Sequence, residues 1–588
     1  MNTLMRLALR FSLFATIGLA ASSPASAVTI SPLPGTPTAM PQTQISFLGA
    51  TAASLSAISV VGSRSGRHAG RLRSYISSPG ASFLVSKPFA PGEQVTVHAI
   101  WRSPVGGRSS LASSFTIAQP VAVSPNGFPS APGTPADVQS FQSEPALHPP
   151  TVIVRQPPGA QSAPGYLFAT PFLGPGQYGP MIFDNAGNLV WFHPLPAGED
   201  AAGLRTQIFE EKNDLTWWQG RTLALGFGQG EDLVADANYK TVAVVRAGNG
   251  LQADEHEFLL TPQGSAYVLA YSPVRADLSS AGGSMDGVAI DGVIQEIDVH
   301  TGLVMWEWHS LGHVGVADSY SQAPTLASAP YDYFHINSLS TDSHGNLLVS
   351  ARNTWTLYDV DAIDGAVMWR LGGKRSSFAL GPGVPFAYQH NAMWHGDREI
   401  SVFDDEGAPP VSPPSRGELI DLDLESKTAT LAGQLVRAAG PLATTSQGDV
   451  QSLPGGDWMV GWGGLPNLTE FNPQGQVIYD AQLPPGENSY RVYREPWNGQ
   501  PTKPPAVIAK TVGATTTVYA SWNGATTTAS WQLLTGASAA HMTAVSTTPS
   551  GGFETTIPAP AAGFYAVRAL SPSGRVLGAS QAVSPAGA

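Results

Sequence analysis

Residues 336–371 read INSLSTDSHGNLLVSARNTWTLYDVDAIDGAVMWRL, and this stretch indicates how the chain folds. It divides into short segments rich in β-branched and aromatic residues, bounded by turn residues, at 336–341, 346–351, 355–360 and 366–371. A tight turn joins the last two segments, since Gly365 can adopt the positive φ that such turns require. The sequence shows no long stretch with the 3.6-residue hydrophobic period of a helix, so we expect antiparallel strands and very little helix.

The turn of this unit recurs along the chain as Gly-x-x-x-Trp/Tyr, with Asp or Asn shortly before the glycine. Clear copies lie 115, 63 and 110 residues apart, at Gly187, Gly302, Gly365 and Gly475. Because two of these gaps are close to twice the third, we expect two degenerate copies, at 236–238 and 425–426. Repeats of a four-stranded unit are typical of a β-propeller. We therefore predict an all-β protein with a six-bladed β-propeller over residues 166–502.

The regions on either side of the repeats have a different pattern. Residues 28–118 and 503–588 contain short alternating segments separated by turn residues, which predict a small β-sandwich at each end. Neither flank has a cluster of ionisable residues, so we expect both to serve packing or oligomerisation. Residues 119–165 are rich in Pro and Ser without periodicity, which indicates a linker or strap.

The first residues resemble an export signal. Arg6 and Arg10 accompany an apolar run at 11–21 that is too short to cross a bilayer. Ala25-Ser26-Ala27 then provides an A-x-A cleavage site. We predict that residues 1–27 are a signal peptide, that the protein is exported to the periplasm or secreted, and that it has no transmembrane segment.

Composition excludes several classes of function. The chain has no cysteine, which rules out disulfides, thiolate catalysis and Cys-ligated metal centres. Its formal net charge is −13 and it lacks a basic run, so neither nucleic acid nor an anionic membrane is an expected partner. With 42% hydrophobic residues and 14 Trp, the chain can still build a large core.

Three histidines occupy matching positions in the repeats. His256, His335 and His390 each stand at the expected start of a blade, and a fourth blade begins at 446–449. The first strands of propeller blades line the central channel, so these side chains should meet there. Arg352 follows an expected strand end and points to the same rim. An imidazole-lined, cationic funnel in an acidic protein indicates an anionic substrate.

Several segments together resemble the arylsulfotransferase family, in particular its shorter secreted branch. In order and rough spacing they cover about residues 165–500, and they are 332–338, 346–352, 369–374, 389–392, 401–405, 446–451, 461–463 and 489–491. The resemblance implies a six-bladed propeller, consistent with the turn count. It also implies an enzyme that moves a sulfuryl group from a phenolic sulfate ester to an acceptor phenol, by a ping-pong route and without a nucleotide sulfate donor.

The resemblance also assigns roles to single residues. It implies that His390 takes the sulfuryl group as a sulfohistidine, while His335 and Asn337 match a His-x-Asn that contacts the sulfate. Arg352 matches an arginine near the sulfate oxygens, and His256 matches a further histidine there. No cofactor and no metal are implied; a homodimer stays open. The residue types suit the chemistry, because Arg, Asn and His can stabilise charge on the sulfate oxygens and move a proton.

Other interpretations stay open at this stage. The propeller could bind a sulfated or other anionic ligand without turning it over. The turns at 298–306 and 361–369 resemble those of quinone-dependent dehydrogenases, although such propellers usually have eight blades. Three histidines could bind zinc or copper. A Gly-x-Ser-x-Gly elbow for a hydrolase is absent. Trp217 and Trp218 are expected to pack between blades rather than form an aromatic rim.

Overall fold

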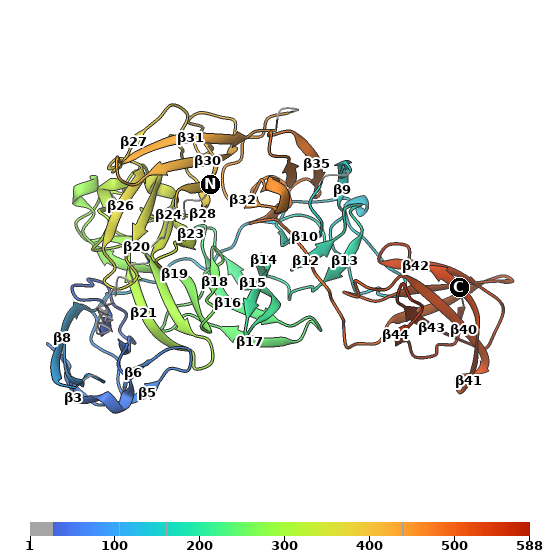
Figure 1. Cartoon of the computed structure of the whole chain (residues 1–588), viewed down its shortest axis with the longest axis horizontal. Coiled ribbons are helices and arrows are strands. Elements are labelled where there is room, and N and C mark those ends of the chain that lie inside the picture. The colour runs from blue at the N-terminus through green and yellow to red at the C-terminus, as the bar shows by residue number, and fades with distance from the viewer. Residues whose placement is uncertain (1–27, 105, 160–161, 438–439, 588) are drawn as a thin grey trace, which may run out of the picture.

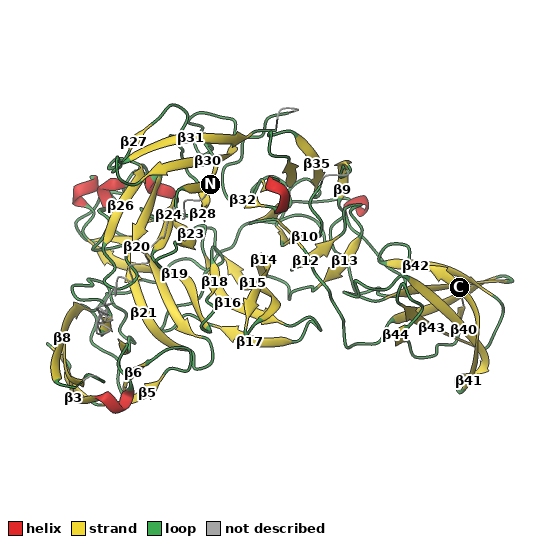
Figure 2. Ribbon diagram, in the orientation of Figure 1, coloured by secondary structure: helices red, strands yellow, loops and turns green. Residues whose placement is uncertain are grey.

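The computed structural model describes residues 28–104, 106–159, 162–437 and 440–587 (Figure 1). The predicted signal peptide, residues 1–27, lies outside the described residues. The protein is all-β, and the helical elements of the described chain are six 3₁₀ turns of three residues each (Figure 2). Within the described ranges, no helix has the length and apolar character needed to traverse a lipid bilayer.

Six sheets of four or five strands, built mainly from antiparallel pairs, follow one another along the middle of the described chain. The first contains β10 (Tyr166–Ala169), β12 (Met181–Phe183), β13 (Leu189–Phe192) and β37 (Tyr493–Glu495), and the second β14 (Asp200–Phe209), β15 (Lys212–Thr222), β16 (Gly228–Ala235) and β17 (Thr241–Val245). The third contains β18 (Phe258–Leu260), β19 (Ser265–Ala276), β20 (Gly287–Asp298) and β21 (Leu303–His309), with β22 (Pro330–Tyr331) parallel to β20.

The later sheets repeat this order. The fourth contains β23 (Ile336–Thr341), β24 (Leu347–Ala351), β25 (Thr356–Val360) and β26 (Val367–Gly372), within one residue of the strands expected from the sequence. The fifth contains β28 (His390–His395), β29 (Glu399–Asp404), β30 (Arg416–Asp423) and β31 (Thr428–Leu435), with β27 (Ala379–Leu380) on β31. The sixth contains β32 (Asp449–Ser452), β33 (Trp458–Gly461), β34 (Asn467–Phe471) and β35 (Val477–Gln482).

The two ends of this region are joined by strand pairing. β37 follows the sixth sheet in sequence but pairs with β10 of the first, with Leu167 opposite Arg494. β9 (Ile153–Gln156) pairs with the edge strand β35, so the segment expected to be a linker contributes a fifth strand to the sixth sheet. Both pairings satisfy edge groups that would otherwise be exposed.

Each of the six turns identified in the sequence joins the last two strands of one sheet. The preceding Asp or Asn has a structural role, because its side-chain oxygen accepts backbone N–H groups within the turn. Asp184 accepts from Ala186 and Asn188, and Asn472 accepts from Gln474 and Gln476. The glycine then takes the positive φ, 75° at Gly365. The local sequence thus accounts for the repeat.

Two further pairs of sheets lie at the ends of the chain, and Figure 1 shows them on different sides of the central sheets. The N-terminal pair contains β1 (Thr29–Ser31), β2 (Ile45–Leu48), β6 (Gly80–Val85) and β5 (Gly70–Ser74), against β4 (Gly66–His68), β3 (Leu55–Gly62), β7 (Gln94–Arg102) and β8 (Arg108–Thr116). The C-terminal pair contains β42 (Glu554–Ala559), β39 (Thr515–Ser521), β38 (Ala506–Val512) and β45 (Ala586–Gly587), against β41 (His541–Pro549), β40 (Ser530–Ser538), β43 (Phe564–Leu570) and β44 (Val576–Ala579).

A buried ion pair ties several central sheets together. Glu257, just before β18, lies between Arg205 of β14, at 2.9 Å, and Arg491, at 2.9 Å. Arg491 also donates to the backbone carbonyls of His256, at 2.9 Å, and Asn337, at 3.2 Å. Burial alone would raise the pKa of Glu257, but the two guanidinium groups outweigh it and lower that pKa. The ionised carboxylate therefore fixes the starts of β18 and β23 relative to the segment before β37.

A second buried network connects the N-terminal sheets to β20 and β21. His309 lies 2.7 Å from Asp291 and 3.0 Å from Glu307, and Thr38 donates to Asp291 at 2.6 Å. Burial alone would lower the pKa of His309, but the two carboxylates outweigh it and raise the pKa to about 10. His309 is therefore a buried cation at neutral pH.

We expect this cation to make stability depend on pH. Because its folded pKa is raised, its contribution is complete below about pH 6.5, the ordinary histidine value, and is lost as pH rises toward about 10. His309→Gln should lower the free energy of unfolding by about 3–5 kcal/mol near neutral pH, since it leaves buried carboxylates unpaired. Urea unfolding at pH 6 and pH 9 tests this, and an equal pH dependence in wild type and variant would contradict it.

Candidate functional site

A cavity of about 680 Å³ lies where the first strands of several sheets begin, and His256, His335, His390 and Arg352 all line it. His335 stands immediately before β23, His390 is the first residue of β28, and His256 and Gln447 lie two residues before β18 and β32. The ring centroids of His256 and His335 are 5.0 Å apart. The structure thus brings together four of the five residues singled out from the sequence.

Each of the three histidines has a carboxylate on its Nδ1 atom. Nδ1 of His256 lies 2.6 Å from Asp254, Nδ1 of His390 lies 2.7 Å from Asp405, and His335 makes the same contact with Asp332. A carboxylate on one ring nitrogen orients the imidazole and determines which nitrogen is available for chemistry. In all three residues that nitrogen is Nε2.

His390 has the clearest tautomer assignment. Its Nε2 accepts the backbone N–H of Gln447 at 3.2 Å, so this nitrogen carries a lone pair and no proton. Burial, reinforced by the nearby Arg352, lowers the pKa of His390 well below its ordinary value. Burial likewise raises the pKa of Asp405 well above its ordinary value. His390 is therefore a neutral imidazole with a nucleophilic nitrogen.

The backbone around the cavity is strained at several positions. His335 and Gln447 have φ of 54° and 69°, and Tyr388, Asn391 and Trp355 also have positive φ. Such conformations cost about 1–3 kcal/mol each in non-glycine residues and tend to gather at functional sites.

Burial lowers the pKa of His335 despite the opposing Asp332 carboxylate, so this imidazole too is held neutral.

Arg352 and Asn337 differ in their access to the cavity. The Arg352 guanidinium donates to Asn353 at 2.9 Å and to the Thr445 carbonyl at 3.0 Å, and it lies 4.7 Å above the Tyr388 ring. It reaches the cavity wall as an oriented cation. Asn337 is fully buried and is not part of the wall, because its Nδ2 donates to the Gln389 carbonyl at 2.7 Å.

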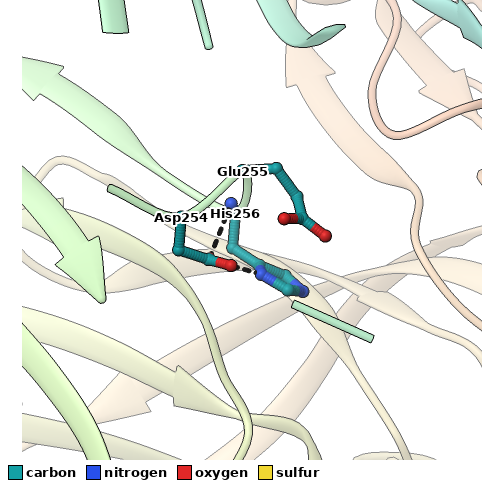
Figure 3. Close-up of side chains that lie close together, drawn as sticks. All are labelled: Asp254, Glu255 and His256. Atoms are coloured by element: carbon teal, nitrogen blue, oxygen red, sulfur yellow. Dashed lines mark hydrogen bonds and ion pairs between the residues drawn. The ribbon is translucent and has the colours of Figure 1, made fainter. Parts of the chain in front are cut away.

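Asp254, Glu255 and His256 form a compact cluster (Figure 3), and two of its members, Glu255 and His256, line the cavity. One oxygen of each carboxylate and one ring nitrogen lie within 4.8 Å of one another, a set that could hold a metal ion. Asp254, however, already accepts the backbone N–H of Gly228 at 2.6 Å, the backbone N–H of His256 at 3.0 Å, and the His256 ring contact. These hydrogen bonds account for its position without a cation.

Part of the cavity wall is apolar, and the segment at 119–165 contributes to it. Phe128, which is 43% exposed, lines the cavity together with Phe172 and Leu225. The chain on either side is fixed by backbone bonds, since Ala224 donates to Asn126 at 2.7 Å and Ala131 donates to Leu173 at 2.6 Å. The cavity thus combines a cationic, imidazole-lined base with walls suited to an aromatic group.

Sequence reasoning missed Phe128, Asp405 and Tyr490 as parts of this site. Tyr490 lies between the histidines, with ring centroids 5.1 Å from His256 and 6.3 Å from His390. Asp405 and Tyr490 fall within the segments that carry the family resemblance, so a signal for them was present. Trp217 and Trp218 are buried and do not line the cavity, as expected.

Comparison with protein families identifies what this chain is similar to. Residues 205–483 match the model of a family described as arylsulfotransferase (ASST). The chain resembles the arylsulfotransferase family. The matched part contains the three histidines, their three aspartates and Arg352, whereas Phe128 and Tyr490 lie outside it.

Solved structures show only distant similarity to this arylsulfotransferase-like chain. A Bacteroides caccae protein of unknown function is 13% identical with a TM-score of 0.35, covering 56% of this chain and 98% of its own. A luciferin-regenerating enzyme is 11% identical with a TM-score of 0.26, covering 59% and 100%. The virginiamycin B lyase of Staphylococcus aureus is 9% identical with a TM-score of 0.25, covering 62% and 95%. No curated protein matches the chain.

The tautomer of His390 can be tested in solution. We expect ¹⁵N NMR of histidine-labelled protein to show an unprotonated Nε2 on His390 at about pH 5.5, where an ordinary histidine is mostly charged. His390→Gln would assign the signal. The exposed His344 gives a second histidine signal in the same spectra for comparison. A His390 signal that protonates with an ordinary pKa would contradict the assignment.

Proposed function

We propose that this protein is an aryl sulfate sulfotransferase that moves a sulfuryl group from a phenolic sulfate ester to a phenol by a ping-pong mechanism. The observation that carries the proposal is the neutral His390, with Asp405 on Nδ1 and an unprotonated Nε2 in a cavity shared with Arg352. The family match over residues 205–483 supports the same chemistry.

We further propose that the six central sheets are the blades of a β-propeller, flanked at 28–118 and 503–588 by two β-sandwich domains. Each sheet is built mainly from strands that are consecutive in the chain, as in a propeller blade. The pairing of β37 with β10 joins the end of the region at 166–502 to its start, which supports a closed ring. This arrangement would explain why equivalent strand starts meet at one cavity. We also propose that the protein is exported, because residues 1–27 have the pattern expected of a signal peptide.

In the first half-reaction, Nε2 of His390 attacks the sulfur atom of the aryl sulfate. The N–S bond forms, the S–O bond to the phenol breaks, and the electron pair leaves with the phenoxide. The ring gains positive charge, and its Nδ1 keeps the contact with Asp405 that orients it. In the second half-reaction the oxygen of an acceptor phenol bonds to the sulfohistidine sulfur as the N–S bond breaks, and the electron pair returns to Nε2. The phenolic proton passes to the group in the cavity wall that protonated the first phenoxide, which restores the neutral imidazole and the starting state.

Groups that line the cavity can stabilise the negative charge on the sulfate oxygens. Arg352 supplies a positive charge, and the Gln447 backbone N–H, now on Nε2, can donate to a sulfuryl oxygen once that nitrogen has reacted. His335 and His256 complete the wall around the sulfate. The sulfate contact that the resemblance gives to Asn337 stays a prediction, because its Nδ2 donates to the Gln389 carbonyl.

One observation favours a second candidate function. The Gln447 N–H occupies the lone pair of His390, so the cavity could hold an anionic aromatic ligand without nucleophilic attack. The protein would then be an exported binder of such ligands, with the same residues serving recognition.

The release of 4-nitrophenol from its sulfate ester distinguishes the two functions. With an acceptor phenol present, we expect turnover by the wild type and a loss of about 10³-fold or more in His390→Ala, because the variant has no nucleophile. Intact protein mass should show a sulfuryl adduct in the wild type without acceptor. Saturable binding with no release would leave the binder as the better account.

Phe128 should affect how well aromatic compounds bind. Phe128→Ala removes an aromatic side chain from the cavity wall, so we expect a rise of about 2–10-fold in KM for the acceptor phenol, with kcat nearly unchanged. Phe128→Leu should have a smaller effect. A large fall in kcat with unchanged KM would show that the segment at 119–132 shapes the reacting geometry instead.

A further inference from the structure

Glu255 is a buried carboxylic acid that the mechanism above leaves unused. Its side chain lies in the cavity wall and the residue is only 8% exposed, yet its Oε2 atom has no hydrogen-bond partner among the described residues. It stands next to the Asp254–His256 pair, as Figure 3 shows, within 4.8 Å of both. A buried, unpartnered carboxyl oxygen is costly, so its position calls for an explanation.

The backbone makes room for this carboxyl group. A Cβ atom at Gly228 would lie 1.9 Å from Oε2 of Glu255, so the carboxyl occupies space that glycine alone leaves free. Burial and the adjacent Asp254 carboxylate raise the pKa of Glu255 well above its ordinary value. Both effects favour the protonated form of this carboxyl group, in a cavity where phenoxide would be released.

His335 is less suited to donate that proton. Burial lowers its pKa and its Nδ1 contacts Asp332, so its Nε2 is unprotonated. A neutral imidazole oriented in this way can accept a proton at Nε2, but it has none to give a departing phenoxide. A protonated carboxyl group can donate one.

We propose that Glu255 is a further catalytic residue that moves the proton in both half-reactions. As the S–O bond breaks, the carboxyl O–H donates its proton to the phenoxide oxygen and Glu255 becomes a carboxylate. When the acceptor phenol attacks the sulfohistidine, that carboxylate takes the phenolic proton, so Glu255 returns to its starting state. This assignment rests on the proposed sulfuryl transfer.

Leaving-group dependence tests the proposal directly. Phenol has a pKa of about 10 and needs a proton to leave, whereas the far more acidic 4-nitrophenol leaves readily as its anion. In Glu255→Gln we expect the single-turnover rate with phenyl sulfate to fall by about 10²–10⁴-fold. The rate with 4-nitrophenyl sulfate should change by less than about threefold, because no acid is needed there.

Two matched variants serve as controls. Glu231→Gln makes the same chemical change on β16, where Glu231 pairs with the exposed Arg246 outside the cavity, and should leave both rates unchanged. Glu255→Asp keeps an acid and should restore part of the phenyl sulfate rate. If Glu255→Gln folds poorly, Glu255→Asp can be compared with the wild type instead. Its rate should fall with phenyl sulfate and stay nearly unchanged with 4-nitrophenyl sulfate.

The outcomes separate this inference from the function on which it rests. Equal losses with both esters, or no loss with either, would overturn a proton-transfer role for Glu255 while leaving the transferase intact. A wild type that forms no sulfuryl adduct and transfers from neither ester would overturn the proposed function, and the inference with it. A loss confined to phenyl sulfate supports the proposal.

Discussion

The buried ion pair between Glu257 and Arg491 is the interaction on which the cavity depends. Arg491 arrives from a segment more than 230 residues away in the chain, yet it bonds to Glu257 and to the carbonyls of His256 and Asn337. These bonds hold two strand starts and the β37 segment at one place. Removing either charge would leave the other buried and unpaired, which is strongly unfavourable. The positions of His256 and His335 follow from this constraint.

The same principle, a buried carboxylate facing a nitrogen, recurs throughout the site. Asp254, Asp332 and Asp405 each orient one imidazole, and the net result is three Nε2 atoms directed to a common cavity. At His309 two carboxylates instead keep an imidazole charged and connect the N-terminal sheets to β20 and β21. Burial and partner geometry thus give histidines opposite protonation states within one protein.

Much of the fold could be predicted from local pattern. The four segments expected at 336–371 match β23 to β26 closely, because alternation and turn residues act over a few positions. The Asp or Asn before each turn is explained by its own backbone contacts, which are equally local. The segment at 119–165 was less predictable. It contributes β9 to the sixth sheet and Phe128 to the cavity through partners distant in sequence.

The sequence by itself determined the repeated four-stranded unit, the matching positions of three histidines, and the resemblance to arylsulfotransferases. These follow from short-range patterning, which a linear chain displays directly. Only the tertiary structure decided that Asp405 lies on His390, that Asn337 donates to the Gln389 carbonyl, and that one oxygen of Glu255 has no hydrogen-bond partner among the described residues. Those features depend on how separate sheets pack and which groups lose their water, and neither can be read along the chain.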